Sequence, residues 1–224
     1  PPPGLHAGDS FFLRETGADP FRSTGPGRLY VGICAPGRGG QTPLVRIWAA
    51  LLCAAAGIWH ATRSAEADRF WTLVGYFNTV RELAGALALF RQDIPERIDF
   101  IGGQFIPDSW KELSSRIDSL ELPAVLELLA RPAPDSPQVL FTTSMFGTGV
   151  DVERLNLMVM WGQPKTAATY IQATGRVGRA SGSLVVVFLR ASWPRDLAHY
   201  EFFSGYHRAL HAHVEPVTVA PFSP

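Results

Sequence analysis

Three short apolar runs constrain the fold of this chain more than any other feature of its sequence. They are VLFTT at 139–143, LMVMW at 157–161 and LVVVFL at 184–189, and none alternates apolar with polar residues. Strands read this way when helices cover both faces of a parallel sheet. Two further β-rich runs, RLYVGIC at 28–34 and FWTLVGYF at 70–77, add to the set. The sequence therefore predicts a three-layer α/β domain with a mostly parallel sheet flanked by helices.

Helix-like segments lie between these runs. One helix is expected from Thr42 to Ala61 and a second from Thr79 to Asp93. Ile98–Ile101 reads as a short strand, and Ser109–Arg131 is expected to hold one or two helices. An amphipathic helix is expected over Pro194–His211. Because ligands of such sheets bind outside the carboxyl ends of the strands, we expect the chemistry on the loops that lead into helices.

The length of 224 residues suggests one domain with extensions. Residues 1–27 are rich in Pro, Gly and polar residues and read as a loop-like N-terminal segment. The domain itself is expected over residues 28–213, and 214–224 would form a C-terminal tail. The chain opens with three prolines and no initiator Met, which suggests an excised fragment.

Composition limits the classes of partner. Lys+Arg and Asp+Glu both number 20, so no global field draws the chain to nucleic acid, and any such contact must be a local patch. The apolar stretch Ile47–Trp59 reads as too short and too alanine-rich to span a bilayer, so no membrane partner is expected. The two cysteines, Cys34 and Cys53, lack metal or disulfide spacing and read as buried free thiols, which suits a reducing cytosol.

Two segments carry the strongest chemical signal: TTSMFGTGVDV at 142–152 and YIQATGRVGR at 170–179. Gln172 and Arg176 are four residues apart and share a helical face. The glycines of the second segment let the chain bend tightly and bring Arg176 close to Arg179. Two neighbouring guanidiniums repel unless an anion lies between them, and their forks match phosphate oxygens. Pairing of both arginines with surface carboxylates is the alternative.

In order, spacing and strand context, these two segments resemble motifs V and VI of superfamily 2 helicases. The resemblance implies the second RecA-like domain of such an enzyme, which is a P-loop NTPase-like helicase C-terminal domain. Within motif V, Thr143 matches the threonine that contacts the nucleic-acid backbone. Gly149 and Asp151 match the glycine and aspartate that meet the ribose and phosphate side of the nucleotide.

Within motif VI, Gln172 matches the glutamine that helps place the γ-phosphate and the attacking water. Arg176 and Arg179 match the two arginines of the family, and Arg179 is the better candidate for the arginine finger. The resemblance therefore implies catalytic roles for all three side chains and nucleotide contacts for both arginines.

YFNTVR at 76–81 follows a strand, opens a helix and resembles helicase motif IV. Thr79 can cap that helix while backbone N–H groups face a phosphate, and Asn78, Thr79 and Arg81 become candidate nucleic-acid contacts. An ordinary strand–cap–helix unit remains an equal alternative. A base-stacking role for Trp161, at the end of a predicted strand, also stays open.

APGRGGQT at 35–42 sits between a strand and a helix, where a phosphate-binding Walker A loop would sit. Ala35 replaces the first glycine of that motif and Gln41 replaces its lysine, so the loop reads as a tight connection. ATP and Mg²⁺ would then be held by a separate N-terminal RecA-like domain of the same parent protein. A complete small nucleotide-binding enzyme using this loop is the rival interpretation.

The sequence of residues 144–179 and 199–224 resembles that of the large helicase of the DISARM anti-phage systems. That resemblance implies a bacterial cytoplasmic DNA helicase or translocase that works with other DISARM proteins, with RNA not excluded as substrate. The alternative from another class is a helicase-like fold retained for protein contacts, without a catalytic role.

Overall fold

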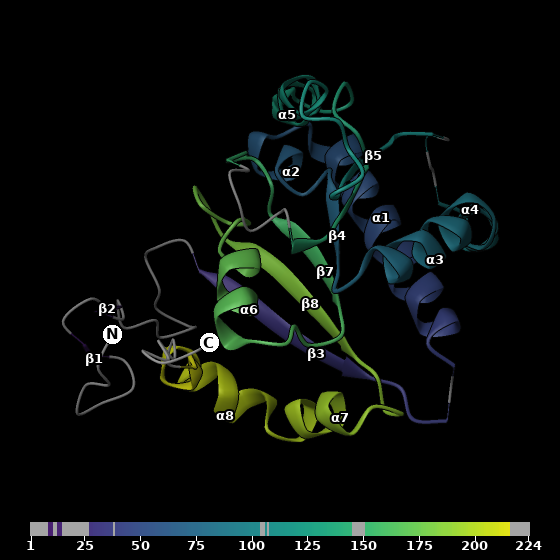
Figure 1. The fold of residues 1–224 in the computed structure, drawn as a ribbon. Helices are drawn as coiled ribbons and strands as arrows, with labels where there is room; N and C mark the ends of the chain where they lie inside the picture. The colour runs from purple at the N-terminus through teal and green to yellow at the C-terminus, as the bar shows by residue number, and fades with distance from the viewer. Residues whose placement is uncertain are drawn as a thin grey trace.

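A computed structural model describes residues 27–37, 39–103, 106, 108–144 and 151–215, together with the backbone of 9–10 and 13–14. These two short segments near the N-terminus are the strands β1 (Asp9–Ser10) and β2 (Leu13–Arg14), which pair with each other as a separate antiparallel ladder. A six-stranded sheet in the order β3-β8-β7-β4-β6-β5 organises the rest, and all its pairings are parallel (Figure 1). Its strands are β3 (Arg28–Cys34), β4 (Leu73–Phe77), β5 (Trp110–Leu113), β6 (Val139–Thr142), β7 (Leu157–Trp161) and β8 (Ser183–Leu189).

Helices cover both faces of this sheet. Three of them, α1 (Gln41–Thr62), α3 (Val80–Arg91) and α4 (Asp93–Phe100), share one core cluster with it. The opposite core cluster takes side chains from α5 (Leu122–Ala130), α6 (Ala167–Thr174) and α8 (Phe203–Arg208). The shorter elements are α2 (Ala65–Asp68), α7 (Pro194–Glu201) and a final 3₁₀ turn, η2 (Leu210–His213). The predicted three-layer α/β fold with a parallel sheet is thus confirmed.

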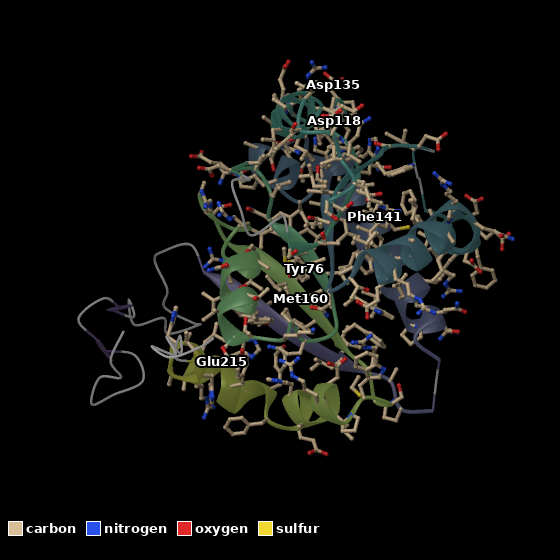
Figure 2. All side chains as sticks on the ribbon, viewed as in Figure 1. Tyr76, Asp118, Asp135, Phe141, Met160 and Glu215 are labelled. Atoms are coloured by element: carbon tan, nitrogen blue, oxygen red, sulfur yellow. The ribbon has the colours of Figure 1, made fainter. Side chains whose placement is uncertain are left out.

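The central strands are buried on both faces, as their unbroken apolar runs predict. Along β7, Met158 and Met160 belong to the core shared with α6, while Leu157 and Val159 belong to the core shared with α1. Met160 is the register partner of Tyr76 on β4, and Figure 2 labels the two side chains next to each other in the sheet. Successive residues of one strand therefore serve opposite layers.

Trp48 of α1 is the largest side chain in the core that α1 shares with the sheet. It is completely buried and stacks on Phe141 of β6, with ring centroids 5.2 Å apart. Gly75 in β4 lies beneath it, and a Cβ at that position would overlap the Trp48 ring. The absence of a side chain at Gly75 thus lets the indole reach the sheet.

α1 spans 22 residues, and by length and composition alone it could cross a membrane. The expectation that its apolar stretch was too short is therefore wrong. Its Leu44, Trp48 and Leu52 are at most 3% exposed and pack on the sheet. One face of α1 thus belongs to the core, and 39% of its most apolar 18-residue window is buried.

One sequence-based expectation in the middle of the chain is wrong, and another needs an addition. Ile98–Ile101 was expected to be a strand, but Ile98 lies in α4 and is fully buried, as is Ile94 one helical turn earlier. The segment Ser109–Arg131 contains one helix, α5, within the expected one or two, and it begins with the edge strand β5, which was not predicted from the sequence. The predicted helix Pro194–His211 is divided into α7, α8 and the start of η2.

Candidate arginine loop and strand-end turns

The segment that joins α6 to β8, residues 175–182, is called here the arginine loop because it carries Arg176 and Arg179. It lies at the amino-terminal edge of the sheet, because α6 runs back from the end of β7 to the start of β8 (Figure 1). The two predicted arginines therefore lie on the opposite side of the sheet from the loops at the carboxyl ends of the strands, where the sequence predicts that ligands bind. Asn78, Thr79 and Thr143 lie on the loops that follow the carboxyl ends of β4 and β6.

An ion pair joins the two predicted nucleotide motifs. Arg179 Nη1 donates a hydrogen bond to Asp151 Oδ1, across 28 positions of sequence. The two side chains are 34% and 65% exposed, so water screens their attraction and the pair is weak. Asp151 and Arg179 are therefore brought together at a surface where a stronger anion can compete for the guanidinium.

The other predicted members of this site differ in exposure. Gln172 is exposed on the last turn of α6, and Arg176 is half-buried just after that helix. The backbone N–H of Arg176 donates to Ala173 O at 3.2 Å, so the arginine continues the helical turn. Gly149 lies outside the described residues.

The arginine loop is held to the start of β7. Gly178 has φ +68°, its N–H donates to Leu155 O at 2.9 Å, and a Cβ there would overlap Ser183. Asn156 Nδ2 donates to Ser181 Oγ at 2.6 Å, and Val177 is fully buried. Glycine at 178 is thus required both by the left-handed backbone and by the close packing.

Arg154 anchors the segment that carries Asp151, and no local sequence pattern marks this residue. Its guanidinium donates to both carboxylate oxygens of Asp68, at 3.1 and 3.0 Å, and to the backbone oxygen of Asp68 at 2.7 Å. It also donates to Thr72 Oγ1 at 3.1 Å and Leu129 O at 3.3 Å. Five hydrogen bonds from one side chain therefore tie this segment to α2, α5 and the approach to β4.

The first turn and the middle of α6 are tethered, which positions the helix that leads into the arginine loop. Thr166 caps its first turn by accepting from Thr169 N at 3.1 Å. The carboxylate of Glu215 accepts the Ala167 N–H at 3.0 Å, and that backbone N–H lowers the pKa of Glu215. Along the helix, Tyr170 bonds His207 Nε2 at 2.8 Å, and burial lowers the pKa of that imidazole.

The motif IV candidates lie at the opposite, carboxyl-terminal edge of the sheet. Thr79 Oγ1 accepts from Glu82 N at 3.2 Å and caps α3, as predicted. Thr79 and Arg81 are exposed, whereas Asn78 is half-buried and its Nδ2 donates to Trp161 O at 3.0 Å. Asn78 thus joins the ends of β4 and β7, and the exposed Thr79 and Arg81 face outward from that junction.

Thr143 and Trp161 occupy this same edge. Thr143 follows the last residue of β6, is 5% exposed, and its N–H donates to Leu113 O at 3.3 Å. The Trp161 ring stacks on Phe188, with centroids 4.6 Å apart and planes inclined by 17°. The packing of Trp161 within the protein accounts for this residue without a base-stacking role.

A charged network at this edge was also missed by sequence reasoning. Arg190, after β8, bonds Glu82 Oε1 at 2.6 Å and Asp196 Oδ2 at 2.9 Å. The Asp196 carboxylate is 1% exposed, and the Arg190 guanidinium lies 3.7 Å over the Trp193 ring. This network ties the first turn of α3 to α7 and so fixes the turn that carries Thr79.

Two glycines with special local geometry lie in the segment between β3 and α1. Gly37 has φ +73°, and a Cβ at Gly40 would lie 3.0 Å from the Trp161 ring. Gly40 precedes α1 without a side-chain cap. Among the residues that the structure describes, no group of three or more His, Cys, Asp or Glu side chains could hold a metal ion.

Comparison with known proteins identifies relatives of this arrangement. Residues 111–181 match the family described as helicase conserved C-terminal domain. The whole chain is 41% identical to part of the DISARM protein DrmA of Bacillus paralicheniformis, and it spans 20% of that protein's length. Among solved structures, the DUF1998 helicase MrfA bound to DNA aligns with 81% of this chain and 22% of its own, at 16% identity and a TM-score of 0.60. Domain 2 of the DEAD-box helicase Mss116p aligns with 78% of this chain and 58% of its own, at 15% identity and a TM-score of 0.51.

Proposed function

We propose that this chain is the C-terminal, second RecA-like domain of a superfamily 2 helicase and that it completes an ATP site whose nucleotide is held mainly by another domain. Closure of the two domains would bring Arg179 and Arg176 to the γ-phosphate and Gln172 to the attacking water. Gly149 and Asp151 would contact the nucleotide from the same side. The observation that carries this proposal is the exposed pairing of Arg179 with Asp151 at the arginine loop.

The chemistry of the arginine loop fits a triphosphate. Bound ATP with Mg²⁺ supplies the phosphoryl group to be transferred, and the metal would be held by the other domain. Arg179 loses little when it leaves Asp151, because an exposed ion pair is worth about 0–1 kcal/mol. A guanidinium that moves to a phosphate gains two parallel hydrogen bonds to a more highly charged anion. In related phosphoryl-transfer enzymes an arginine finger accelerates turnover by about 10³–10⁵.

The turns that follow β4 and β6, which carry Asn78, Thr79, Arg81 and Thr143 and are called here the strand-end turns, would bind a nucleic-acid backbone. Thr79 and Arg81 are exposed beside the capped N-terminus of α3, Asn78 fixes their turn, and Thr143 lies at the end of the neighbouring strand β6. Helix N-termini and arginines contact phosphates without reading sequence, so we propose weak sequence preference. DNA is the proposed substrate, in the bacterial cytoplasm and with other DISARM proteins as partners, and the kinship with DrmA supports this setting.

A protein-interaction module without a catalytic role is the second candidate. Three aromatic side chains around α7 favour it, because Trp193, Tyr200 and Phe202 are 52%, 41% and 59% exposed. Aromatic residues are enriched in protein interfaces. In this case turnover by the parent protein would not depend on the arginine loop.

The deciding experiment measures nucleic-acid-stimulated ATP hydrolysis by the protein that contains this domain, as wild type and as Arg179→Ala. ATP affinity is measured in parallel, and Arg208→Ala, an exposed arginine on α8, is the matched control. We expect Arg179→Ala to lose turnover by about a hundredfold or more while it retains ATP binding. Turnover equal to that of the control would reject the finger assignment and favour the interaction module.

A further inference from the structure

We propose that Arg28 is a positioning residue for the arginine loop, an inference that rests on the function proposed above. Arg28 is the first residue of β3 and precedes Val177 by 149 positions. Its Nε donates to Val177 O at 2.8 Å and its Nη2 donates to Gly175 O at 3.3 Å. The two acceptor carbonyls belong to the residues on either side of Arg176, so one guanidinium fixes the backbone from which that arginine projects.

The charge of Arg28 suits the end of α6. The carbonyl groups at a helix C-terminus carry a partial negative charge, which a nearby cation stabilises. The last turn of α6 contains no basic residue, and Arg28, at the start of β3, supplies the cation there. The planar fork of arginine reaches two carbonyls at once, whereas a lysine ammonium is a compact point charge on a flexible stem.

A second contact from β3 meets the same region. Tyr30 Oη donates to Thr174 Oγ1 at 3.3 Å, and the Tyr30 and Tyr170 rings lie 6.1 Å apart. From the other side, Gly178 N donates to Leu155 O at 2.9 Å. The arginine loop is therefore held between β3 and the start of β7, with Arg28 as its charged contact on the β3 side.

The fold of β3 does not depend on the Arg28 side chain. All seven residues of β3 pair in register with β8 through the backbone, and Arg28 itself is exposed. Truncation at Cβ would therefore release Gly175 O and Val177 O while the sheet stays paired. Reacting groups must be held close to their productive geometry, and a misplacement of about 1 Å can cost on the order of a hundredfold in rate.

The test compares Arg28→Ala, Arg28→Lys and the control Arg208→Ala in the protein that contains this domain together with its nucleotide-binding partner domain. We expect Arg28→Ala to lower kcat for ATP by on the order of 10- to 100-fold, with little change in ATP affinity or melting temperature. Arg28→Lys should lie between wild type and Arg28→Ala. Guanidinium at a non-denaturing millimolar concentration should restore part of the lost turnover to Arg28→Ala.

Two results would overturn the inference. One is turnover of Arg28→Ala equal to that of Arg208→Ala while Arg179→Ala is inactive. The other is a loss of turnover that follows a lowered melting temperature and does not respond to guanidinium, because that pattern indicates a general structural role. If Arg179→Ala itself keeps full turnover, the proposed function is wrong, and the two failures are thereby distinguished.

Discussion

Arg154 and Arg179 lie on either side of β7 in sequence, and each is paired with an aspartate, but their surroundings differ. The Arg154 side chain is 10% exposed and its partner Asp68 is 20% exposed, whereas Arg179 and Asp151 are 34% and 65% exposed. Removing one member of a largely buried pair leaves the other charge uncompensated. The same removal at an exposed pair leaves a charge that water can solvate.

Arg154→Ala is therefore expected to lower the free energy of unfolding by about 3 kcal/mol, since it also leaves the Asp68 and Leu129 carbonyls without this donor. Asp151→Ala, the control at the exposed pair, is expected to change it by less than about 1 kcal/mol. Urea unfolding monitored by circular dichroism gives both values. Equal shifts in the two variants would show that the Arg154 contacts do not hold the fold.

At the scale of single elements, β4 and α3 each contain a glycine, and the two glycines differ in the space around them. Gly75 in β4 lies under the Trp48 ring, where a Cβ would overlap the indole. Gly85 is an exposed interior residue of α3, and nothing lies within 4 Å of a Cβ built there. The first glycine is required by packing, whereas the second only weakens its helix.

Gly75→Ala is expected to destabilise the protein by about 1–3 kcal/mol, because Trp48 must move in a filled core. Gly85→Ala is expected to stabilise it by about 0.5–1 kcal/mol, because alanine is the better helix former. Thermal unfolding of both variants tests the pair. Shifts of the same sign would contradict the packing described for Trp48.

The elements that could be predicted from sequence were those whose burial matches a simple pattern. β6, β7 and β8 are buried on both faces, so their apolar runs identified them. α4 was missed because Ile98–Ile101, taken alone, looks like a short strand. The helix becomes evident only when Ile94 and Ile98, four residues apart and both buried, are considered together. β5 was missed because it is an edge strand, and its charged Lys111 and Glu112 gave no sign of the pairing with β6 that makes it a strand.

The candidate site divides in the same way. Arg176, Arg179 and Asp151 could be proposed from sequence because glycine and arginine spacing marks them locally. The pairs Arg154–Asp68 and Arg190–Glu82 could not, because their members lie 86 and 108 positions apart in the sequence. Such contacts arise only when the sheet brings distant segments together.

At the scale of the whole molecule, the arginine loop and the strand-end turns lie at opposite edges of one sheet (Figure 1). The five residues of β7 connect the edges, with Asp151 and Arg154 before the strand and the Trp161 carbonyl, which accepts from Asn78, at its end. A strand of this length spans about 17 Å at roughly 3.3 Å per residue. Side chains at one edge therefore cannot contact a ligand bound at the other.

This separation predicts that the proposed ATP turnover and the proposed DNA binding can be lost independently of each other. In the protein that contains this domain, Arg81→Ala should weaken binding of single-stranded DNA and lower the salt dependence of log Kd by about one unit. Arg179→Ala should leave DNA binding and its salt dependence unchanged while turnover is lost. DNA titrations at several salt concentrations measure both. Equal loss of DNA affinity in the two variants would contradict the assignment of separate edges.

The hydrogen bonds of Arg28 end on main-chain carbonyls, and this has a consequence for how the domain can evolve. Every residue type offers the same carbonyl, so the contact itself sets no requirement on the side chains at positions 175 and 177. Selection would then act on position 28 alone, and no compensating substitution would record the partnership. Methods that infer proximity from correlated mutation would miss this contact, even in an alignment of thousands of homologues.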